Sequence, residues 1–542
     1  MKRVVCSISV VAIGLLAAAC GNKKAGGSNP IDVVMEKKFA DEGIVPKEAS
    51  REELCHRLSA DLLGHYLAAD EVAAVCGGSA SEIVSRMQAR PEYLRVSERV
   101  WRDRMNTSDV NVDWRYLKDL YAEVDRLHQG KSSYKDFAIV AMSHPGFIES
   151  AVQPEDKVKI VYKAFLGRSP TATEAADLSA LYRPWIPAAV PDPDFPYVYS
   201  VIVKILPALC DPLTTCTTTA LGGGQLDLSG FADPQYQGIP YENLTEAQLS
   251  AIREPGRVFT SQSFFWEAGA DEILNRYLGW SDGGRFPREP GIVLPEVREA
   301  LAQYLEKSNS YRDAERVVLS SWLYRQSSVV EDDGLGDDPT APVPKVYAHG
   351  PVKPADAEVW LDSTAALTLP LGACDARYSD GFSYFLILQA IQNGMVSNAQ
   401  GYIDIRTLYD LREDQMPWDE TQKLPDFTYT SVARILGGCP GFQSQRQPAA
   451  GLSYAFTQEA IAELICTPGT AQHLAPAGVA SPTLDQVLTH QMRITFGRDP
   501  LDSEKAAFAT AKNGCSGSDC TGAGLQNAVC VGLLGSAEMV FY

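Results

Sequence analysis

The chain has 542 residues, 45% of them hydrophobic and 21% charged, a composition typical of folded soluble proteins with two to four domains. Its 68 acidic and 48 basic residues give a formal net charge of −20. The phosphates of nucleic acids attract basic surfaces, so this charge excludes nucleic acid as an expected partner.

The N-terminus has the pattern of a secretory signal. A basic start is followed by a short apolar run from Val4 to Ala19, too short for a stable transmembrane helix, and then by Cys20. This setting resembles the lipobox of bacterial lipoproteins, whose cysteine is acylated and becomes the first residue, although Ala17 stands where leucine is usual. The alternative is a plain signal peptide cut nearby. We predict a lipoprotein signal over residues 1–19, lipidation of Cys20 and an envelope protein anchored by lipid, in the outer membrane.

The residues after Cys20 are mostly Gly, Asn, Lys and Ser, which bury little area. We predict a flexible tether over residues 20–45. No later segment has the length and hydropathy of a membrane span. The expected partners are therefore the membrane, through the N-terminal lipid, and other envelope proteins or glycans.

A helix–turn–helix pattern then recurs. It is first met at residues 53–76, where Gly64 marks the turn. A left-handed glycine is a common helix end, and packing the two helices antiparallel would bring Cys55 and Cys76 together. We predict a disulfide between these two cysteines.

The most complete copy spans residues 158–181. Its apolar residues have helical spacing up to Gly167, and Pro170 prevents the first helix from continuing. Thr171 and Glu174 have the spacing of a capping box, which predicts the start of a second helix. Further copies have their turns at Gly279, before an irregular insertion and a helix that starts at Pro295, and at Gly497.

A second motif places a small residue four positions before a large one. Four residues is one helical turn, and we interpret the pair as a packing feature of one helix, in which the small side chain lets a neighbour approach and the large one fills the groove. The serines in it are not expected to be nucleophiles. The pairs are Ala89 and Tyr93, Ser143 and Phe147, Ser320 and Tyr324, and Gly535 and Met539.

The cysteine count fits an oxidising compartment. Without Cys6 and Cys20, ten of the twelve cysteines remain, an even number suited to disulfides. Cys210 and Cys216 are close enough to pair locally, whereas the six C-terminal cysteines allow fifteen connectivities and the sequence does not choose among them. Haem and zinc spacings are lacking, so we expect neither metal nor cofactor. The disulfide candidates are Cys55, Cys76, Cys210, Cys216, Cys374, Cys439, Cys466, Cys515, Cys520 and Cys530.

The recurring hairpins predict a mainly α fold of two or three packed helical domains with little or no β-sheet. The best boundary is an acidic, proline-containing stretch, whose aspartates lack the spacing of a twelve-residue calcium loop. We predict a helical domain at 46–150, a second with irregular insertions at 151–330, a linker at 331–345 and a C-terminal helical domain at 346–542.

These motifs resemble two companion families of domains of unknown function that accompany cytochromes in planctomycete-type bacterial proteins. In the C-terminal half, Ala357, Glu358, Asp362 and Ser363 are placed like the AE-x-x-x-DS of one family, and the segments Phe496–Glu504 and Cys530–Glu538 like its closing motifs. The resemblance implies an exported, helix-rich envelope protein without an established activity, and it transfers no catalytic residue. This chain lacks the haem-binding module.

Two charged pairs occupy the same place in two copies: Arg168 with Glu174, and Arg498 with Glu504. The planar guanidinium groups could bind an anionic ligand, or each could clamp its own turn through the nearby glutamate; we favour the clamp. The sequence contains no hydrolase triad, zinc-protease, phosphate-loop or dinucleotide motif, so no catalytic residue is predicted.

From the sequence we expect a binding or assembly component of the envelope. The alternatives are an envelope carbohydrate-active hydrolase, since paired carboxylates leave no sequence signature, and a partner of an electron-transfer cytochrome.

Overall fold

The computed structural model is α-helical throughout the part of the chain that it describes, which contains no strand and a single isolated bridge between Glu48 and Gln326. This confirms the predicted mainly α fold. The described residues are 29–105, 107, 114–144, 147, 154–166, 168–182, 246–262, 264–279, 294–328, 347, 350–353, 355, 357–364, 366–367, 458–459, 462–463, 465–466, 473–517 and 520–540.

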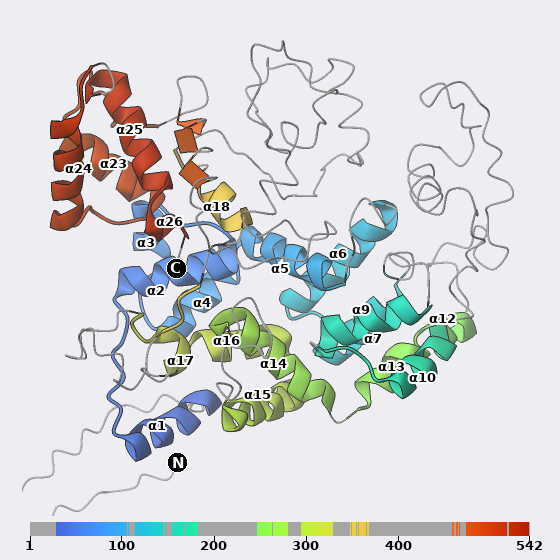
Figure 1. Ribbon diagram of the computed structural model, residues 1–542. Coiled ribbons are helices and arrows are strands. Elements are labelled where there is room, and N and C mark those ends of the chain that lie inside the picture. Colours follow the sequence, from blue (N-terminus) through green and yellow to red (C-terminus); the bar gives the residue numbers. More distant parts are fainter. Residues whose placement is uncertain are drawn as a thin grey trace, which may run out of the picture.

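Most helices fall into five units that follow one another along the chain (Figure 1). The first unit is α2 (Arg51–Leu63), α3 (Ala69–Val75) and α4 (Ala80–Met87), and the second is α5 (Pro91–Arg104), α6 (Trp114–His128) and α7 (Tyr134–Ser143). The third is α9 (Pro154–Leu166), α10 (Ala172–Tyr182), α12 (Glu246–Ile252) and α13 (Glu254–Thr260), and the fourth is α14 (Phe264–Leu278), α15 (Pro295–Ser308) and α16 (Tyr311–Leu319). The fifth is α23 (Leu484–Thr495), α24 (Asp502–Gly514) and α25 (Gly522–Leu534), and the remaining helices are α1 (Pro30–Glu42), α17 (Trp322–Arg325), α18 (Ala357–Thr364) and α26 (Ala537–Val540).

The turn after α2 requires glycine for two reasons. Gly64 has φ 74°, in the left-handed region, and its N–H donates to the carbonyls of Ser59 and Ala60, which ends α2. A Cβ at this position would lie 2.8 Å from Val96. Gly279 and Gly497 have φ 67° and 70°, as the repeated pattern predicts, while Gly167 lies outside the described residues.

The second motif is a helix break, not one turn of a continuous helix as we expected. At Ser320, α16 has just ended, and Tyr324 belongs to the new helix α17. The small residue lies at or just after the end of one helix. The backbone N–H of the large residue donates to the carbonyl three positions before it. The four bonds run from Tyr93 to Arg90 (3.3 Å), Phe147 to His144 (2.9 Å), Tyr324 to Ser321 (3.1 Å) and Met539 to Ser536 (3.2 Å).

A fifth instance of this break occurs in the third unit. Ser261 follows α13, and the N–H of Phe265 donates to Gln262 at 3.1 Å. Phe265 is fully buried, like the large residues of the other four instances. The break therefore closes each of the five units and leads into the helix that follows.

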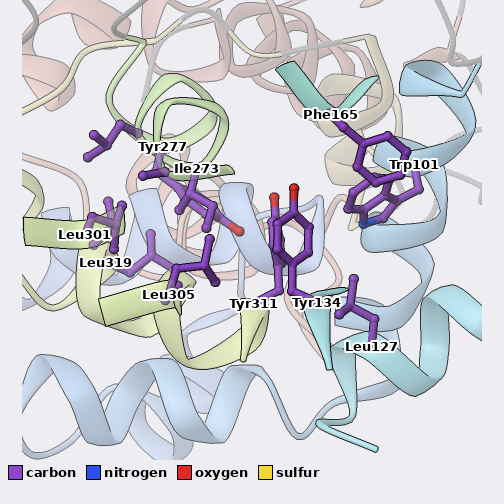
Figure 2. Close-up of a cluster of buried hydrophobic side chains, with 14 of the residues drawn as sticks. Trp101, Leu127, Tyr134, Phe165, Ile273, Tyr277, Leu301, Leu305, Tyr311 and Leu319 are labelled. Carbon is purple, nitrogen blue, oxygen red and sulfur yellow. The ribbon is translucent and has the colours of Figure 1, made fainter. Parts of the chain in front are cut away.

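The first four units enclose one hydrophobic core. The first unit contacts the second through α2 and α5, the second contacts the third through α7 and α13, and the third contacts the fourth through α9 and α14. Helix α16 of the fourth unit returns to α4 and α6. Figure 2 shows part of the shared interior, with Tyr134 and Tyr311 side by side between Trp101 and the leucines of α15. This core joins residues from the predicted domains 46–150 and 151–330.

Helix α1 corrects the predicted tether. We expected a flexible segment as far as residue 45, but α1 starts at Pro30, with the side chain of Asn29 accepting from the N–H of Ile31 at 3.0 Å. Ile31, Met35 and Phe39 are buried at a spacing of four and join the shared core. The polar composition of the preceding residues concealed this short apolar stripe.

A second core lies in the C-terminal part and is formed by α18, the fifth unit and residues of the first hairpin. Ala60 and Tyr66 belong to this second core, so the first hairpin contributes to both. A Cβ at Gly497 would lie 2.6 Å from the carbonyl oxygen of Leu67, which shows how closely the turns of the first and fifth units approach. In Figure 1 the fifth unit accordingly lies beside α3.

Candidate functional site

A buried carboxylate distinguishes the fourth unit from the others. Glu315 lies five residues before Ser320 in α16, and it is fully buried. The corresponding positions in the other units are also buried, but they carry small or apolar side chains: Val84, Ala138, Gly256 and Cys530. Glu315 thus places a charge where the repeat otherwise has none, and its partners define the candidate site.

Three groups hold the carboxylate. The hydroxyls of Tyr93 and Tyr277 donate to it at 2.5 Å and 2.7 Å, and the guanidinium of Arg276 donates at 2.9 Å. Tyr93 is the large residue of the first helix break, and Arg276 and Tyr277 lie in the last turn of α14. Both oxygens of Glu315 are therefore satisfied by charged or hydroxyl donors, as a buried carboxylate requires.

His128 extends these contacts to a fourth helix. Its Nε2 accepts from the indole N–H of Trp101 at 3.0 Å, because an indole can only donate. In the neutral ring the proton then lies on Nδ1, which is 2.8 Å from the hydroxyl of Tyr93. A continuous chain of donors results, from Trp101 through His128 and Tyr93 to Glu315. We refer to these residues, with Arg276 and Tyr277, as the Glu315 network.

The ionisation states follow from burial and charge. Burial lowers the pKa of His128, which outweighs the attraction of Glu315, and the ring is neutral at pH 7. Burial alone would raise the pKa of Glu315, but the hydrogen-bonding groups of His128 and Tyr93 and the charge of Arg276 bring it below its ordinary value. Burial raises the pKa values of Tyr93 and Tyr277, so both hydroxyls keep the protons that they donate. The network holds one carboxylate balanced by one guanidinium.

A second ion pair lies next to the network. Arg104 pairs with Glu272 and donates to the hydroxyl of Tyr311 at 3.0 Å. Tyr311 packs on Tyr134 with ring centroids 5.2 Å apart, and Tyr134 stacks on Phe265, the large residue of the third break. Aromatic rings from the second and fourth units thus pack next to the buried charges.

The geometry fixes how the units meet. Glu315 belongs to the fourth unit, His128 and Trp101 to the second, and Tyr93 to the break between the first and the second. The donors reach the buried carboxylate in one register of the helices. Any other packing would leave the charge buried without partners, which costs free energy. The role of the network is therefore to orient helices, and the two oxygens of Glu315 are satisfied by its other members.

The predicted pair Arg168 and Glu174 lies at the surface and clamps its turn. Two guanidinium nitrogens donate to the carboxylate at 2.9 Å and 2.8 Å, which lowers the pKa of Glu174 to about 2. The same carboxylate accepts from the N–H of Thr171 at 2.8 Å, as the capping box requires. The guanidinium also lies over the ring of Tyr162, 5.0 Å from its centroid.

The equivalent pair in the fifth unit has the same geometry and one addition. Arg498 donates to Glu504 at 2.9 Å and 2.6 Å, and Glu504 accepts from the N–H of Leu501 at 2.6 Å. Arg498 also donates to Glu538, at the start of α26, at 3.0 Å. Here the clamp joins the turn to the helix break of the same unit, and it is half-buried.

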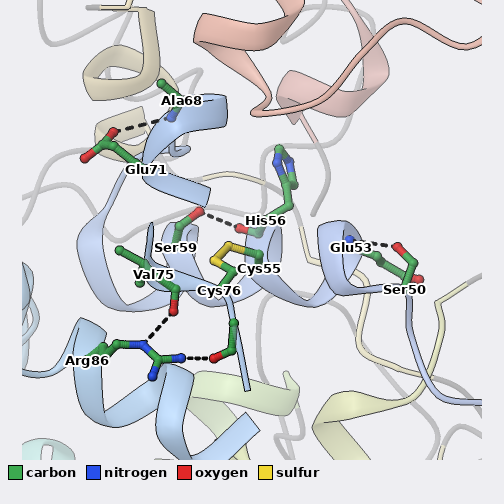
Figure 3. Close-up of a disulfide and its surroundings, with 11 residues drawn as sticks. Ser50, Glu53, Cys55, His56, Ser59, Ala68, Glu71, Val75, Cys76 and Arg86 are labelled. Atoms are coloured by element: carbon green, nitrogen blue, oxygen red, sulfur yellow. Dashed lines mark hydrogen bonds between the residues drawn. A yellow bond between two sulfur atoms is a disulfide. The ribbon is translucent and has the colours of Figure 1, made fainter. Parts of the chain in front are cut away.

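The structure contains the predicted disulfide, which joins Cys55 in α2 to Cys76 at the end of α3 (Figure 3). It also pairs Cys466 with Cys530, and Cys515 with Cys520, a choice that the sequence left open. Cys20, Cys210, Cys216, Cys374 and Cys439 lie outside the described residues, as do the predicted signal and linker.

The C-terminal part is attached to the first hairpin and to α5 by residues that carried the family resemblance. Asp362 accepts from Arg99 at 2.7 Å, and the hydroxyl of Ser363 accepts from the N–H of Tyr66 at 3.1 Å. His56 stacks on Tyr66, and burial lowers the pKa of His56 to about 3. These motif residues therefore position helices against one another.

Sequence reasoning missed the Glu315 network because its members lie up to 222 residues apart. One signal was present: aligning the units on their helix breaks places Glu315 at an otherwise apolar position.

Within the described ranges, no set of three or more His, Cys, Asp or Glu side chains is grouped to hold a metal ion. None of the described helices combines the length and apolar character needed to cross a membrane. No family model, curated protein or solved structure matches the chain.

Proposed function

We propose that the protein is an exported, lipid-anchored component of the bacterial cell envelope that binds or assembles with other envelope components. The N-terminal sequence supplies the export signal and the acylated residue, Cys20. The observation that carries the proposal is the use of cysteine in the folded body, where Cys55–Cys76 and Cys466–Cys530 lie inside the two cores. Paired buried cysteines are typical of proteins that fold in an oxidising compartment.

The binding or assembly role rests on the construction of the body. The most strongly perturbed buried acid, Glu315, has all its donors inside the protein, and the two recurring arginines are held by their own glutamates. These groups stabilise an array of helices. Arrays built from repeated helical units commonly act by presenting an extended surface to a partner.

Export and anchoring can be tested together by expressing the full chain with and without Cys20→Ala. We expect the unaltered protein in the membrane fraction, labelled by a palmitate analogue, with its body cysteines oxidised. The variant should lose the label and leave the membrane fraction. Cytoplasmic recovery of the unaltered protein with free thiols would contradict the proposal.

The assembly role needs a separate experiment. Cross-linking in intact cells, followed by capture of the lipidated protein and mass spectrometry, should recover the same envelope proteins or glycans in repeated preparations. The Cys20→Ala variant is the matched control for contacts that depend on location. A protein recovered only as an isolated monomer would contradict a role in assembly.

A further inference from the structure

The three described disulfides differ in their exposure. Cys55–Cys76 and Cys466–Cys530 are buried, with exposed fractions of 0 to 1% for all four residues. Cys515 is exposed and Cys520 is half-buried, and their disulfide closes a short loop between α24 and α25. A thiol must reach a sulfur atom to attack it, so among the three described disulfides only this one is open to reagents in the folded protein.

We propose that Cys515–Cys520 is a thiol–disulfide exchange site that takes low-molecular-weight or protein thiols and latches α24. Exchange at this site requires neither lipidation nor an envelope partner.

The ends of the two helices give the exchange a direction. Cys515 caps the C-terminus of α24, where the partial negative charge of the helix opposes a thiolate. Cys520 precedes Thr521, the N-cap of the 13-residue helix α25, and the Thr521 side chain makes no capping hydrogen bond. The N–H groups of that first turn have no partner within the helix, and they stabilise a thiolate on Cys520. Exposure and helix polarity thus favour attack at Cys515 with Cys520 leaving.

The reaction is balanced by two thiols. A thiolate attacks Sγ of Cys515, a new disulfide forms between them, and the bond to Cys520 breaks with its electron pair on Cys520. A second thiol then attacks the external sulfur of the mixed disulfide. The net change oxidises two external thiols to one disulfide and reduces Cys515 and Cys520 to thiols.

Helix α24 is the element that this disulfide controls. It contains no buried residue, in contrast to α23 and α25. Its N-terminal end is held by the pair Arg498 and Glu504, and Phe508 packs near Gly532 of α25. The disulfide is the bond at its C-terminal end. Elements with few buried contacts open with low free energy, so cleavage is expected to loosen the last turns of α24.

The test uses the full mature protein in detergent and reduced glutathione. After a time course, free thiols are alkylated and the cysteines are mapped by mass spectrometry. We expect Cys515–Cys520 to open at least about tenfold faster than Cys55–Cys76 and Cys466–Cys530, because the buried pairs require opening of the fold. Early samples should carry glutathione on Cys515. Equal opening of the three disulfides, or glutathione mainly on Cys520, would overturn the proposal.

Hydrogen exchange of the same samples tests the latch. Peptides from the C-terminal half of α24 should exchange faster after reduction, while those from α23 stay unchanged. The variant Cys515→Ser/Cys520→Ser should reproduce this pattern without reductant, and the wild-type protein remains informative if the variant does not fold. Unchanged exchange in α24 after complete cleavage would show that the disulfide does not latch the helix.

Discussion

The middle helices of the fourth and fifth units occupy the same place in the repeat but are stabilised differently. Helix α15 buries Val297, Leu301, Ala302 and Leu305, because α14 and α1 cover it. Helix α24 buries no side chain and is held by an arginine clamp and a disulfide. The comparison indicates that the repeated unit determines the order of the helices, whereas closure of the first four units supplies the burial of α15. In the fifth unit, α23 and α25 are buried in the second core, but the middle helix α24 depends on ionic and covalent bonds.

The largest expected effect comes from removing the charge at the centre of the closed array. Glu315→Ala leaves Arg276 buried without its partner and two tyrosine hydroxyls without an acceptor, which should cost about 3–5 kcal/mol of unfolding free energy. Urea unfolding of the full chain measures this loss of unfolding free energy. Val84→Ala, at the corresponding position of the first unit, is the control and should cost less, about 1–2 kcal/mol. Equal losses for the two variants would show that the network contributes nothing specific.

Acid should act through the buried histidines. Burial lowers the pKa of His56 to about 3 and that of His144 to about 4, so both are neutral in the folded protein and become protonated on unfolding below pH 6.5. The unfolded state then binds more protons, and stability falls as the pH drops below 6.5. Each histidine contributes a slope of about 1.4 kcal/mol per pH unit. Chemical unfolding between pH 7 and 5 should show a shallower slope for His144→Gln. If the slope of His144→Gln equalled that of the unaltered protein, other groups would take up the protons on unfolding.

A smaller effect is expected where the fifth unit meets the first hairpin. Gly497→Ala combines left-handed strain with a contact to the carbonyl of Leu67, whereas Gly279 has nearly the same φ and no described atom within 4 Å of the place that a Cβ would take. Gly279→Ala should cost about 1–2 kcal/mol from strain. Gly497→Ala should cost at least about 1 kcal/mol more from overpacking. Thermal unfolding of the two variants measures the difference, and identical losses would argue against close contact of the turns.

The smallest effect distinguishes the two arginine clamps. Arg168→Ala breaks a surface pair, which is typically worth about 0–1 kcal/mol, so its melting temperature should fall only slightly. Arg498→Ala breaks a half-buried clamp to both Glu504 and Glu538, and the fall should be larger. A greater loss for Arg168→Ala, or unchanged stability with loss of an anionic ligand, would contradict the clamp interpretation.

Local features of the fold could be predicted from the sequence because they depend on neighbouring residues. The turn at Gly64, the capping box of Thr171 and Glu174, the helix start at Pro295 and the disulfide Cys55–Cys76 all follow from spacing within one hairpin. The start of α1 was missed because its short apolar stripe follows a polar segment.

The candidate site could not be predicted in the same way. Glu315 and Tyr93 come together only when the fourth unit returns to the first, and no local pattern specifies that closure. The break at Ser261 was missed because two adjacent phenylalanines obscure the spacing. Once the breaks are aligned, however, Glu315 is the exception among apolar residues, which is a signal that the sequence contains.

Native-state hydrogen exchange of the oxidised full chain tests the central comparison most directly. We predict that α15 exchanges through openings with a free energy close to that of α16, which shares its core, and that α24 exchanges through openings of clearly lower free energy. Equal protection of α15 and α24 would contradict the claim that closure of the first four units supplies the burial of α15.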